Sequence, residues 1–569
     1  MPSDRHGRTF ARHPEEWFGT VVNPEGYPAF PGGRAILGHR VRYPCKILSA
    51  SVVFPAGHGP PAPQKANAAE YKQNARSKLR LAGLTGDPEE SAMSTTNVPE
   101  PARVLARLDR ISVWALPGLF IGIIGLGFLF TFYDMFDVNV SFIQTCTSIV
   151  AGCTPKTAAS YIGLPILLNL VGYVAGALVL APLSDRFGRR DMLLVTMLLT
   201  GIGSLATAFA TSYWFFIWAR AFTGLGVGAD LAIVNTYIGE VAPVAQRGKY
   251  TSLIVVFSAF GAFFGIWLAL WLTTPATPWP LGLPFAVAGP GFDIGWRIMY
   301  VIGAALGVVG VALRFQIPES PRWLVSRGKI EEAAAVVADM EQRAELDLPE
   351  VRDEDIQAER TVLKAHPVPY VDILTNKVYL FRAIWLAVMW FLAYMTIYAY
   401  AEGMVSILTG LNYPPPEAGL ITAFGTFGFI ACALFAFRYG ERLDRHLWII
   451  ISALITLAGS LILGLAGHFL ALSLLGAAVI FFGFNLWVPL GYAWTAEHFP
   501  HRARATGFGL TDGIGHIGGG VGILLIAPLL PQLDVTKALV FCSLFLFLAW
   551  IVSTLGVKTR ARPLEEVSP

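Results

Sequence analysis

The chain has 569 residues, of which 54% are hydrophobic and only 14% are charged, whereas about a quarter of the residues of a soluble protein are charged. The apolar residues fall in repeated blocks of about 20, each long enough to cross a bilayer core, so the composition predicts a membrane protein. A net charge of +3, spread over short loops, offers no basic face for nucleic acid. The sequence shows no nucleophile motif, metal-ligand cluster or phosphate loop, so we expect neither an enzyme nor a bound cofactor or metal.

The first stretch, residues 1–92, is rich in Pro, Arg, His and Gly and has no sustained hydrophobic period. We expect residues 1–110 to form an unfolded cytosolic extension. Met93 begins a short polar lead into the first apolar block, so one explanation is that translation starts at Met93 and that the upstream stretch is an artefact of the gene boundary. A genuine cytosolic tail is the alternative.

Twelve apolar blocks follow, in two groups of six. They predict an all-α membrane protein with one six-helix bundle at residues 111–315, a cytosolic linker with short helices at 316–378, a second bundle at 379–557 and a cytosolic tail at 558–569. The predicted spans lie near residues 113–143, 160–182, 192–210, 213–238, 251–273, 297–315, 380–404, 417–437, 447–467, 469–494, 504–529 and 535–557.

Lys and Arg are concentrated in alternate loops, which by the positive-inside rule places both termini in the cytosol. We expect the membrane to be the cytoplasmic one. The opposite loops carry few basic residues, and one of them contains Cys146 and Cys153. These two cysteines can form a disulfide if their loop faces an oxidising compartment, or remain free thiols.

Two motifs recur at the same place in each group of spans. "SDRFGRR" at 184–190 aligns with "GERLDRH" at 440–446, and "GEVAPVAQRG" at 239–248 aligns with "AEHFPHRARA" at 496–505. The two offsets agree within one residue, so the sequence predicts that the halves arose by duplication.

With these repeats, "LSDRFGRR" after the second span, "RAFTGLGVGAD" in the fourth and "PESPRWL" after the sixth, the chain resembles the major facilitator superfamily in its sugar and metabolite porter branch. The likeness covers about residues 103–557. It implies alternating access between two six-helix bundles and a small-molecule solute moved together with protons. We expect the protein to work as a monomer in the lipid bilayer.

Buried charges offer a coupling site. Asp134 and Asp137 in the first span are three residues apart and share one helical face, where a charged carboxylate at mid-membrane needs a partner. Counted from the outer helix ends, Asp137 and Arg220 of the fourth span lie at matching depths of about 9 and 10 Å. In the resembled proton-coupled sugar porters, the aspartate and arginine at these motif positions act as a protonation switch, which implies an ion pair between Asp137 and Arg220 whose protonation shifts the equilibrium between outward and inward states. A purely structural pair is the alternative.

Other polar groups lie within predicted spans. Asp134 is additional to the sugar-porter pattern and is similar to the Asp-x-x-Asp spans of aromatic-acid and phosphate symporters in the superfamily. Asp230 lies about 15 Å inward of Arg220 and is either a second relay carboxylate or a satisfied polar group. Asp512 and His516 share a face of the eleventh span, either as a solute or proton site or as a hydrogen-bonded structural pair. Glu402, near the outer end of the seventh span, is expected to be interfacial.

Charged residues at the inner helix ends predict a cytosolic gate. In the resembled family, acidic and basic residues at these positions pair across the two halves and hold the cytosolic side closed. Ordinary positive-inside topology would explain the arginines but not the acidic residues. The predicted gate comprises Asp185, Arg186, Arg189, Arg190, Glu240, Arg247, Glu441, Arg442, Glu497 and Arg504.

The fifth and seventh spans contain no glutamine, whereas the resembled sugar porters bind hexoses through glutamines there. We therefore predict a proton-coupled symporter of a small, anionic organic or aromatic acid, with Arg220 or His516 facing its carboxylate. A sugar:proton symporter and a non-transporting nutrient receptor of the same fold are the alternatives. The expected cavity residues are Asn169, Asn235, Trp390, Tyr394, Tyr398, Asn485, Asp512 and His516.

Overall fold

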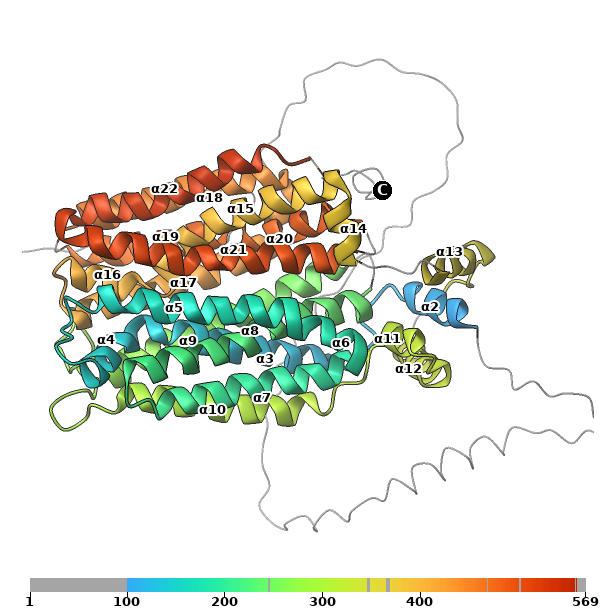
Figure 1. The fold of residues 1–569 in the computed structure, drawn as a ribbon, viewed down its shortest axis with the longest axis horizontal. Helices are drawn as coiled ribbons and strands as arrows, with labels where there is room; N and C mark the ends of the chain where they lie inside the picture. The colour runs from blue at the N-terminus through green and yellow to red at the C-terminus, as the bar shows by residue number, and fades with distance from the viewer. Residues whose placement is uncertain are drawn as a thin grey trace, which may run out of the picture. The chain divides into compact units, whose positions relative to one another are not determined.

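The structure is a computed structural model that describes residues 100–243, 246–344, 348–364, 369–467, 469–500, 503–557 and 559. In this described part of the chain, twelve helical segments are long and apolar enough to cross a membrane. They form two bundles of six (Figure 1), so the predicted fold class is confirmed. Residues 1–92 lie outside the described residues, and with them the question of where translation starts.

The first half contains six spans, two of which are interrupted. A π-helical turn, η1 (Gly176–Leu180), separates α5 from α6, and Asp137 separates α3 from α4. Ser212 caps the longest of these helices by accepting a hydrogen bond from the backbone N–H of Phe215. The helices are α3 (Gly118–Phe136), α4 (Val138–Ile149), α5 (Ala159–Ala175), α6 (Ala181–Phe187), α7 (Arg189–Ala208), α8 (Tyr213–Val241), α9 (Arg247–Thr273) and α10 (Gly295–Arg314).

The second half repeats this plan. Its first span is likewise broken, between α15 and α16, and Asn376 and Asp534 cap its first and last helices. The elements are α15 (Lys377–Ala401), α16 (Met404–Gly410), α17 (Pro415–Tyr439), η3 (Gly440–Arg442), α18 (Arg445–Leu465), α19 (Leu470–Asn485), α20 (Val488–Glu497), α21 (Arg504–Ile526), η5 (Ala527–Gln532) and α22 (Val535–Ser553).

Short helices gather at one end of the bundles, and we call them the pad: α2 (Pro101–Asp109), α11 (Pro321–Ser326), α12 (Ile330–Ala344) and α13 (Asp353–Lys364), with α14 (Pro369–Thr375) leading into α15. α2 packs on α11, α12 and α13 (Figure 1), and Arg107 and Arg110 both bind Glu341 of α12. The expectation of an unfolded segment as far as residue 110 is therefore wrong for residues 101–109, because the apolar face of α2 packs on the other pad helices.

Within the first half, α5 and α8 approach until their backbones touch. A Cβ atom on Gly224 would collide with the backbone carbonyl of Asn169, and one on Gly172 would collide with that of Ala221. Small residues on the facing sides of both helices allow this close contact, as is common where helices pack in lipid.

The halves meet along two long seams, where α5 packs on α21 and α9 packs on α17. α4 also contacts α16 at the end of the bundles away from the pad (Figure 1), which we call the far end. A disulfide joins Cys146 of α4 to Cys153, with 5.9 Å between their Cα atoms, which resolves the two alternatives for these cysteines.

Candidate functional site

Arg220 lies in the first third of α8, two turns from its start at Tyr213, and is 2% exposed. Its Nη1 donates to Oδ2 of Asp134 at 2.8 Å, and its Nη2 donates to the backbone carbonyl of the same residue at 2.9 Å. The predicted ion pair with Asp137 is therefore wrong in this conformation. The two carboxylates share a helix face, and depth alone could not decide which of them α8 would meet.

Asp137 is nevertheless close to this pair, at the junction of α3 and α4. It is 0% exposed, and neither of its carboxyl oxygens accepts a well-aligned hydrogen bond from the described residues. It interacts electrostatically with both Asp134 and Arg220. A buried carboxyl group with no counter-ion of its own is stable when it holds a proton, because the ionised form would lose its hydration without compensation.

Asp230 forms a separate buried ion pair. Arg314 at the end of α10 binds it through Nη1 and Nη2, with Nη2 donating to Oδ2 at 3.0 Å, and Thr196 donates to Oδ1 at 2.7 Å. Because Asp230 has these partners, the structure favours its role as a satisfied polar group over its role as a second relay carboxylate. Arg314 was not among the predicted site residues, although it lies within the predicted span 297–315 and is 1% exposed.

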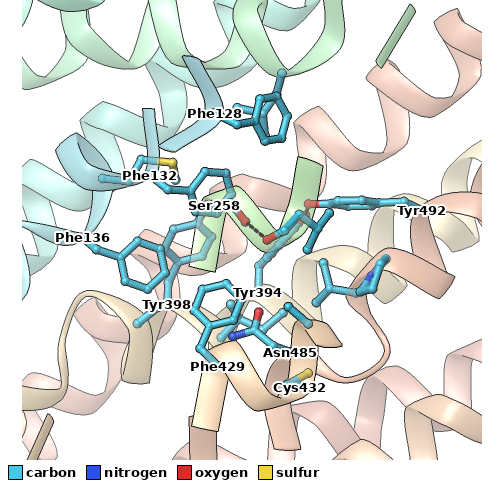
Figure 2. Close-up of a pocket in the computed structure, with 18 of the residues that line it drawn as sticks. Phe128, Phe132, Phe136, Ser258, Tyr394, Tyr398, Phe429, Cys432, Asn485 and Tyr492 are labelled. Atoms are coloured by element: carbon cyan, nitrogen blue, oxygen red, sulfur yellow. Dashed lines mark hydrogen bonds between the residues drawn. The ribbon is translucent and has the colours of Figure 1, made fainter. Parts of the chain in front are cut away.

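A cavity lies between the two halves and is lined by residues from both (Figure 2). Phe136 lines one side and Tyr492 the opposite side. The walls are mainly apolar, seven of the lining residues are Phe or Tyr, and the few polar groups include Asn235, Ser258 and Asn485. The lining residues are Phe128, Phe132, Met135, Phe136, Leu231, Asn235, Thr251, Val255, Ser258, Tyr394, Ile397, Tyr398, Ala401, Phe429, Cys432, Ala433, Asn485, Val488, Pro489, Tyr492 and His516.

His516 is the only residue with an ionisable ring nitrogen among these lining residues. Its ring stacks on that of Tyr173 at a centroid distance of 4.0 Å, and the ring of Tyr394 is tilted against it at 3.9 Å. Its Nδ1 lies 2.8 Å from the backbone carbonyl of Asp512, which can only accept, so Nδ1 carries a hydrogen. Nε2 has no hydrogen-bond partner among the described residues and is the polar atom that the ring can offer to a solute.

The carboxylate of Asp512 lies behind this ring. It accepts hydrogen bonds from Tyr394 at 2.6 Å and from Tyr173 at 3.2 Å, and its Oδ2 is 3.6 Å from Nδ1 of His516. The expected contact between Asp512 and His516 therefore forms, although the shorter contact of Nδ1 is to the backbone carbonyl. Tyr173 and Tyr492 had not been predicted, because no single helix brings them to this position.

Five of the eight predicted cavity residues line it: Asn235, Tyr394, Tyr398, Asn485 and His516. Asn169 does not, since its side chain donates to the backbone carbonyl of Arg220 at 2.8 Å. Trp390 also lies outside, where it stacks on Trp487 and donates to Thr495 at 2.9 Å. Phe128, Phe132 and Phe136 were missed, although their spacing of four residues along the first span places them on one helix face.

The gate residues of the first half form a network at the pad end. Arg189 binds Asp185 at 2.6 Å and Glu240 at 2.9 Å. Glu319 of "PESPRWL" accepts from the backbone N–H groups of Arg189 and Arg190 at 3.0 and 3.2 Å. Burial raises the pKa of Glu319 in spite of these bonds.

In the second half, Arg445 binds Glu497 at 3.4 Å. The gate pairs described above join residues within one half, so none of these pairs crosses between the halves as the resemblance implies. The side chains of Glu441 and Arg504 lie outside the described part of the structure. The remaining predicted gate residues lie at the same helix ends: Arg186 over the ring of Phe187, Arg442 over that of Tyr439, and a half-buried Arg247.

Comparison with known families is consistent with this architecture. The family described as "Sugar (and other) transporter" matches residues 119–569. The chain belongs to this family. It is therefore a multi-pass membrane transporter of the major facilitator type and not an enzyme.

Relatives differ in the solute named for them. The niacin transporter NiaP of Acinetobacter baylyi is 24% identical over 82% of this chain and 99% of its own length. The glucose transport protein of a Synechocystis strain is 26% identical over 72% of this chain and 90% of its own. The Escherichia coli xylose transporter XylE, in a partially occluded inward-open conformation, superposes with a TM-score of 0.61 at 21% identity, covering 78% of this chain and 99% of XylE.

Proposed function

We propose that this protein is a proton-coupled symporter of a small organic acid that contains an aromatic ring. It works by alternating access as a monomer in the cytoplasmic membrane, with the pad and both termini in the cytosol. The observation that carries the proposal is Asp137, a fully buried carboxyl group that accepts no well-aligned side-chain hydrogen bond from the described residues and lies beside the pair of Arg220 with Asp134. The group is a proton site next to a charge pair that can exchange partners.

Exchange of partners supplies the coupling. When Asp137 loses its proton, it competes with Asp134 for the guanidinium of Arg220, since all three groups interact electrostatically. Either carboxylate can then hold Arg220, and the two arrangements place different demands on the packing of α3 against α8. A proton thus shifts the population of the two transport states.

The cavity favours a planar aromatic ring over a hexose. A hexose needs many hydrogen bonds in a desolvated site, whereas most of the residues that line this cavity are apolar or aromatic. Four phenylalanines and three tyrosines among them present ring faces and edges on which a planar solute can stack.

His516 is the group that we assign to the carboxylate of the solute. Because Nδ1 donates to the carbonyl of Asp512, the neutral ring presents Nε2 as an acceptor only. A carboxylate can bind there only when Nε2 also carries a hydrogen, and the nearby carboxylate of Asp512 stabilises the imidazolium ion. The solute anion would therefore enter together with a proton.

The names of the relatives agree with this choice in part. Niacin, named for two relatives, is an aromatic acid with one ring and one carboxylate, the size and charge that the proposal requires. The rival candidate is a sugar, because the relatives also include a glucose transport protein and the xylose symporter XylE.

Uptake into proteoliposomes tests the proposal. Protein in vesicles with an inward proton gradient is given labelled nicotinate, benzoate, glucose or xylose, and we expect accumulation of an aromatic acid that collapses when the gradient is dissipated. Asp137→Asn should lower gradient-driven accumulation at least about tenfold, the factor that corresponds to 1.4 kcal/mol. His516→Gln should raise the half-saturating acid concentration, whereas His446→Gln, outside the cavity, should not. Gradient-driven uptake of a sugar alone, or unchanged coupling in Asp137→Asn, would refute the proposal.

A further inference from the structure

The first helix of each half is interrupted at an acidic residue. α3 ends at Phe136 and α4 begins at Val138, with Asp137 between them. α15 ends at Ala401 and α16 begins at Met404, and Glu402 lies in the gap. α4 and α16 then pack on each other at the far end, so the two interruptions face the same region from opposite halves.

Glu402 is not interfacial, as its position near a helix end had suggested. It is 1% exposed, and its Oε1 has no hydrogen-bond partner among the described residues. The charged and titratable groups that interact with it electrostatically are Arg220 of α8, Asp134 and Asp137 of the first span, and Tyr398 of its own helix. Glu402 is thus a third carboxyl group beside a single guanidinium.

The charges of this cluster do not balance. Asp134 and Arg220 neutralise each other at 2.8 Å. If Asp137 and Glu402 were both ionised, two uncompensated negative charges would lie close together in the membrane interior, where each costs several kcal/mol. The arrangement with the far end closed is therefore stable only when both groups hold protons.

Asn139 connects the cluster to the far end. Its Nδ2 donates to the backbone carbonyls of Tyr400 and Ala401 at 3.1 and 2.6 Å, and its Oδ1 accepts from the N–H of Val405 at 3.1 Å. These bonds cross from the first half to the second and hold both edges of the gap that contains Glu402. Separation of α4 from α16 must break them and admit water to the carboxyl group.

We propose that Glu402 is a second coupling proton site, contributed by the second half, and that its protonation allows the far end to close over the cavity. The inference builds on the proton coupling proposed above and assigns to it a group that closes the access path. Loss of the proton leaves a charge that is solvated only when α16 moves away from α4.

A cross-link at the far end tests this inference without any solute. A Cβ atom on Gly410 of α16 would lie 3.6 Å from that of Ala159 of α5, within the range of a disulfide. Purified Ala159→Cys/Gly410→Cys protein in proteoliposomes is oxidised briefly at pH 5.5 to 8.5. Cleavage at a protease site inserted in the polar segment between the halves then separates the uncross-linked fragments, while the native disulfide of Cys146 with Cys153 lies within one half.

The expected result is a pH-dependent difference between variants. Glu402→Gln mimics the protonated group, so its cross-linking rate divided by that of the parent should be near one at pH 5.5 and rise at least about fivefold by pH 8.5. The ratio removes the intrinsic pH dependence of thiol oxidation. Glu402→Asp, which still titrates, should follow the parent, and so should Glu417→Gln, a buried acid elsewhere in the second half. A ratio for Glu402→Gln that does not change with pH overturns the inference.

The two proposals fail in different ways. If Asp137→Asn abolishes gradient-driven uptake while the cross-linking ratio stays flat, the proton coupling stands and Glu402 has no part in it. If the ratio rises but no tested acid is taken up, the gate stands and the assignment of the solute is wrong. Gel filtration and the unfolding temperature of each variant show whether the protein has folded.

Discussion

Replacement of Asp230 tests whether its ion pair with Arg314 is structural. The two side chains are 0% and 1% exposed, and they meet in the interior of the first half. Asp230→Asn would leave the guanidinium of Arg314 buried without its counter-ion. Removal of one partner of a buried pair costs about 3–5 kcal/mol, because the remaining charge keeps its desolvation penalty. We expect a loss of stability of this order.

The assay is the apparent unfolding temperature of the purified protein in detergent, followed by tryptophan fluorescence. For a cooperative unit of roughly 200 residues, such as one six-helix half, 1 kcal/mol corresponds to about 2–4 °C, so the single variant should unfold roughly 6–20 °C lower. The double variant Asp230→Asn/Arg314→Gln replaces the pair by two neutral amides that can bond to each other and to Thr196. It should recover most of the loss.

Two results would refute this reasoning. An unfolding temperature for Asp230→Asn equal to that of the parent would mean that Arg314 is not held by this partner. A double variant that is stable but has lost gradient-driven uptake would restore the relay carboxylate as the correct reading of Asp230.

Two further predictions concern packing and pH. Gly224→Leu should abolish the monodisperse gel-filtration peak, because the added side chain meets backbone atoms of α5 that cannot move aside, whereas Gly239→Ala in the same helix has open space and should behave as the parent. Burial alone would raise the pKa of Glu341, but hydrogen bonds from Arg107 and Arg110 outweigh it and hold the pKa below its usual 4.5. A carboxyl group whose pKa is lowered by folding stabilises the fold at any pH above its unfolded-state pKa, and this stabilisation is lost as the pH falls through its folded-state pKa. Protease cleavage near α2 should therefore accelerate below about pH 4, whereas its rate should not change between about pH 8 and 6. The Glu341→Gln variant should be cleaved faster than the parent at both pH 8 and pH 6. A cleavage rate of the parent that does not depend on pH would contradict this contact.

The sequence by itself determined the membrane class, the twelve spans and the two related halves. These features are local, since a bilayer requires a run of apolar residues of defined length and each run can be read without its neighbours. The same logic identified Asp134, Asp137 and Arg220 as charges inside spans. It also placed Tyr394 and Tyr398, which lie one turn apart on the seventh span, at the cavity, although it added Trp390, which lies outside.

Only the tertiary structure decided which charges meet. Asp134 and Asp137 share a helix face, so a small rotation of α3 against α8 selects the partner of Arg220, and that rotation depends on packing across the whole half. The position of Glu402 near a helix end predicts an interfacial residue, whereas in the structure α4 and α16 pack together and bury it. Arg314 lies at the end of a predicted span with no partner that the sequence pattern identifies, and the structure places Asp230 beside it. Pairing within 3 Å depends on depth and rotation between segments far apart in the chain, and no local pattern specifies either one.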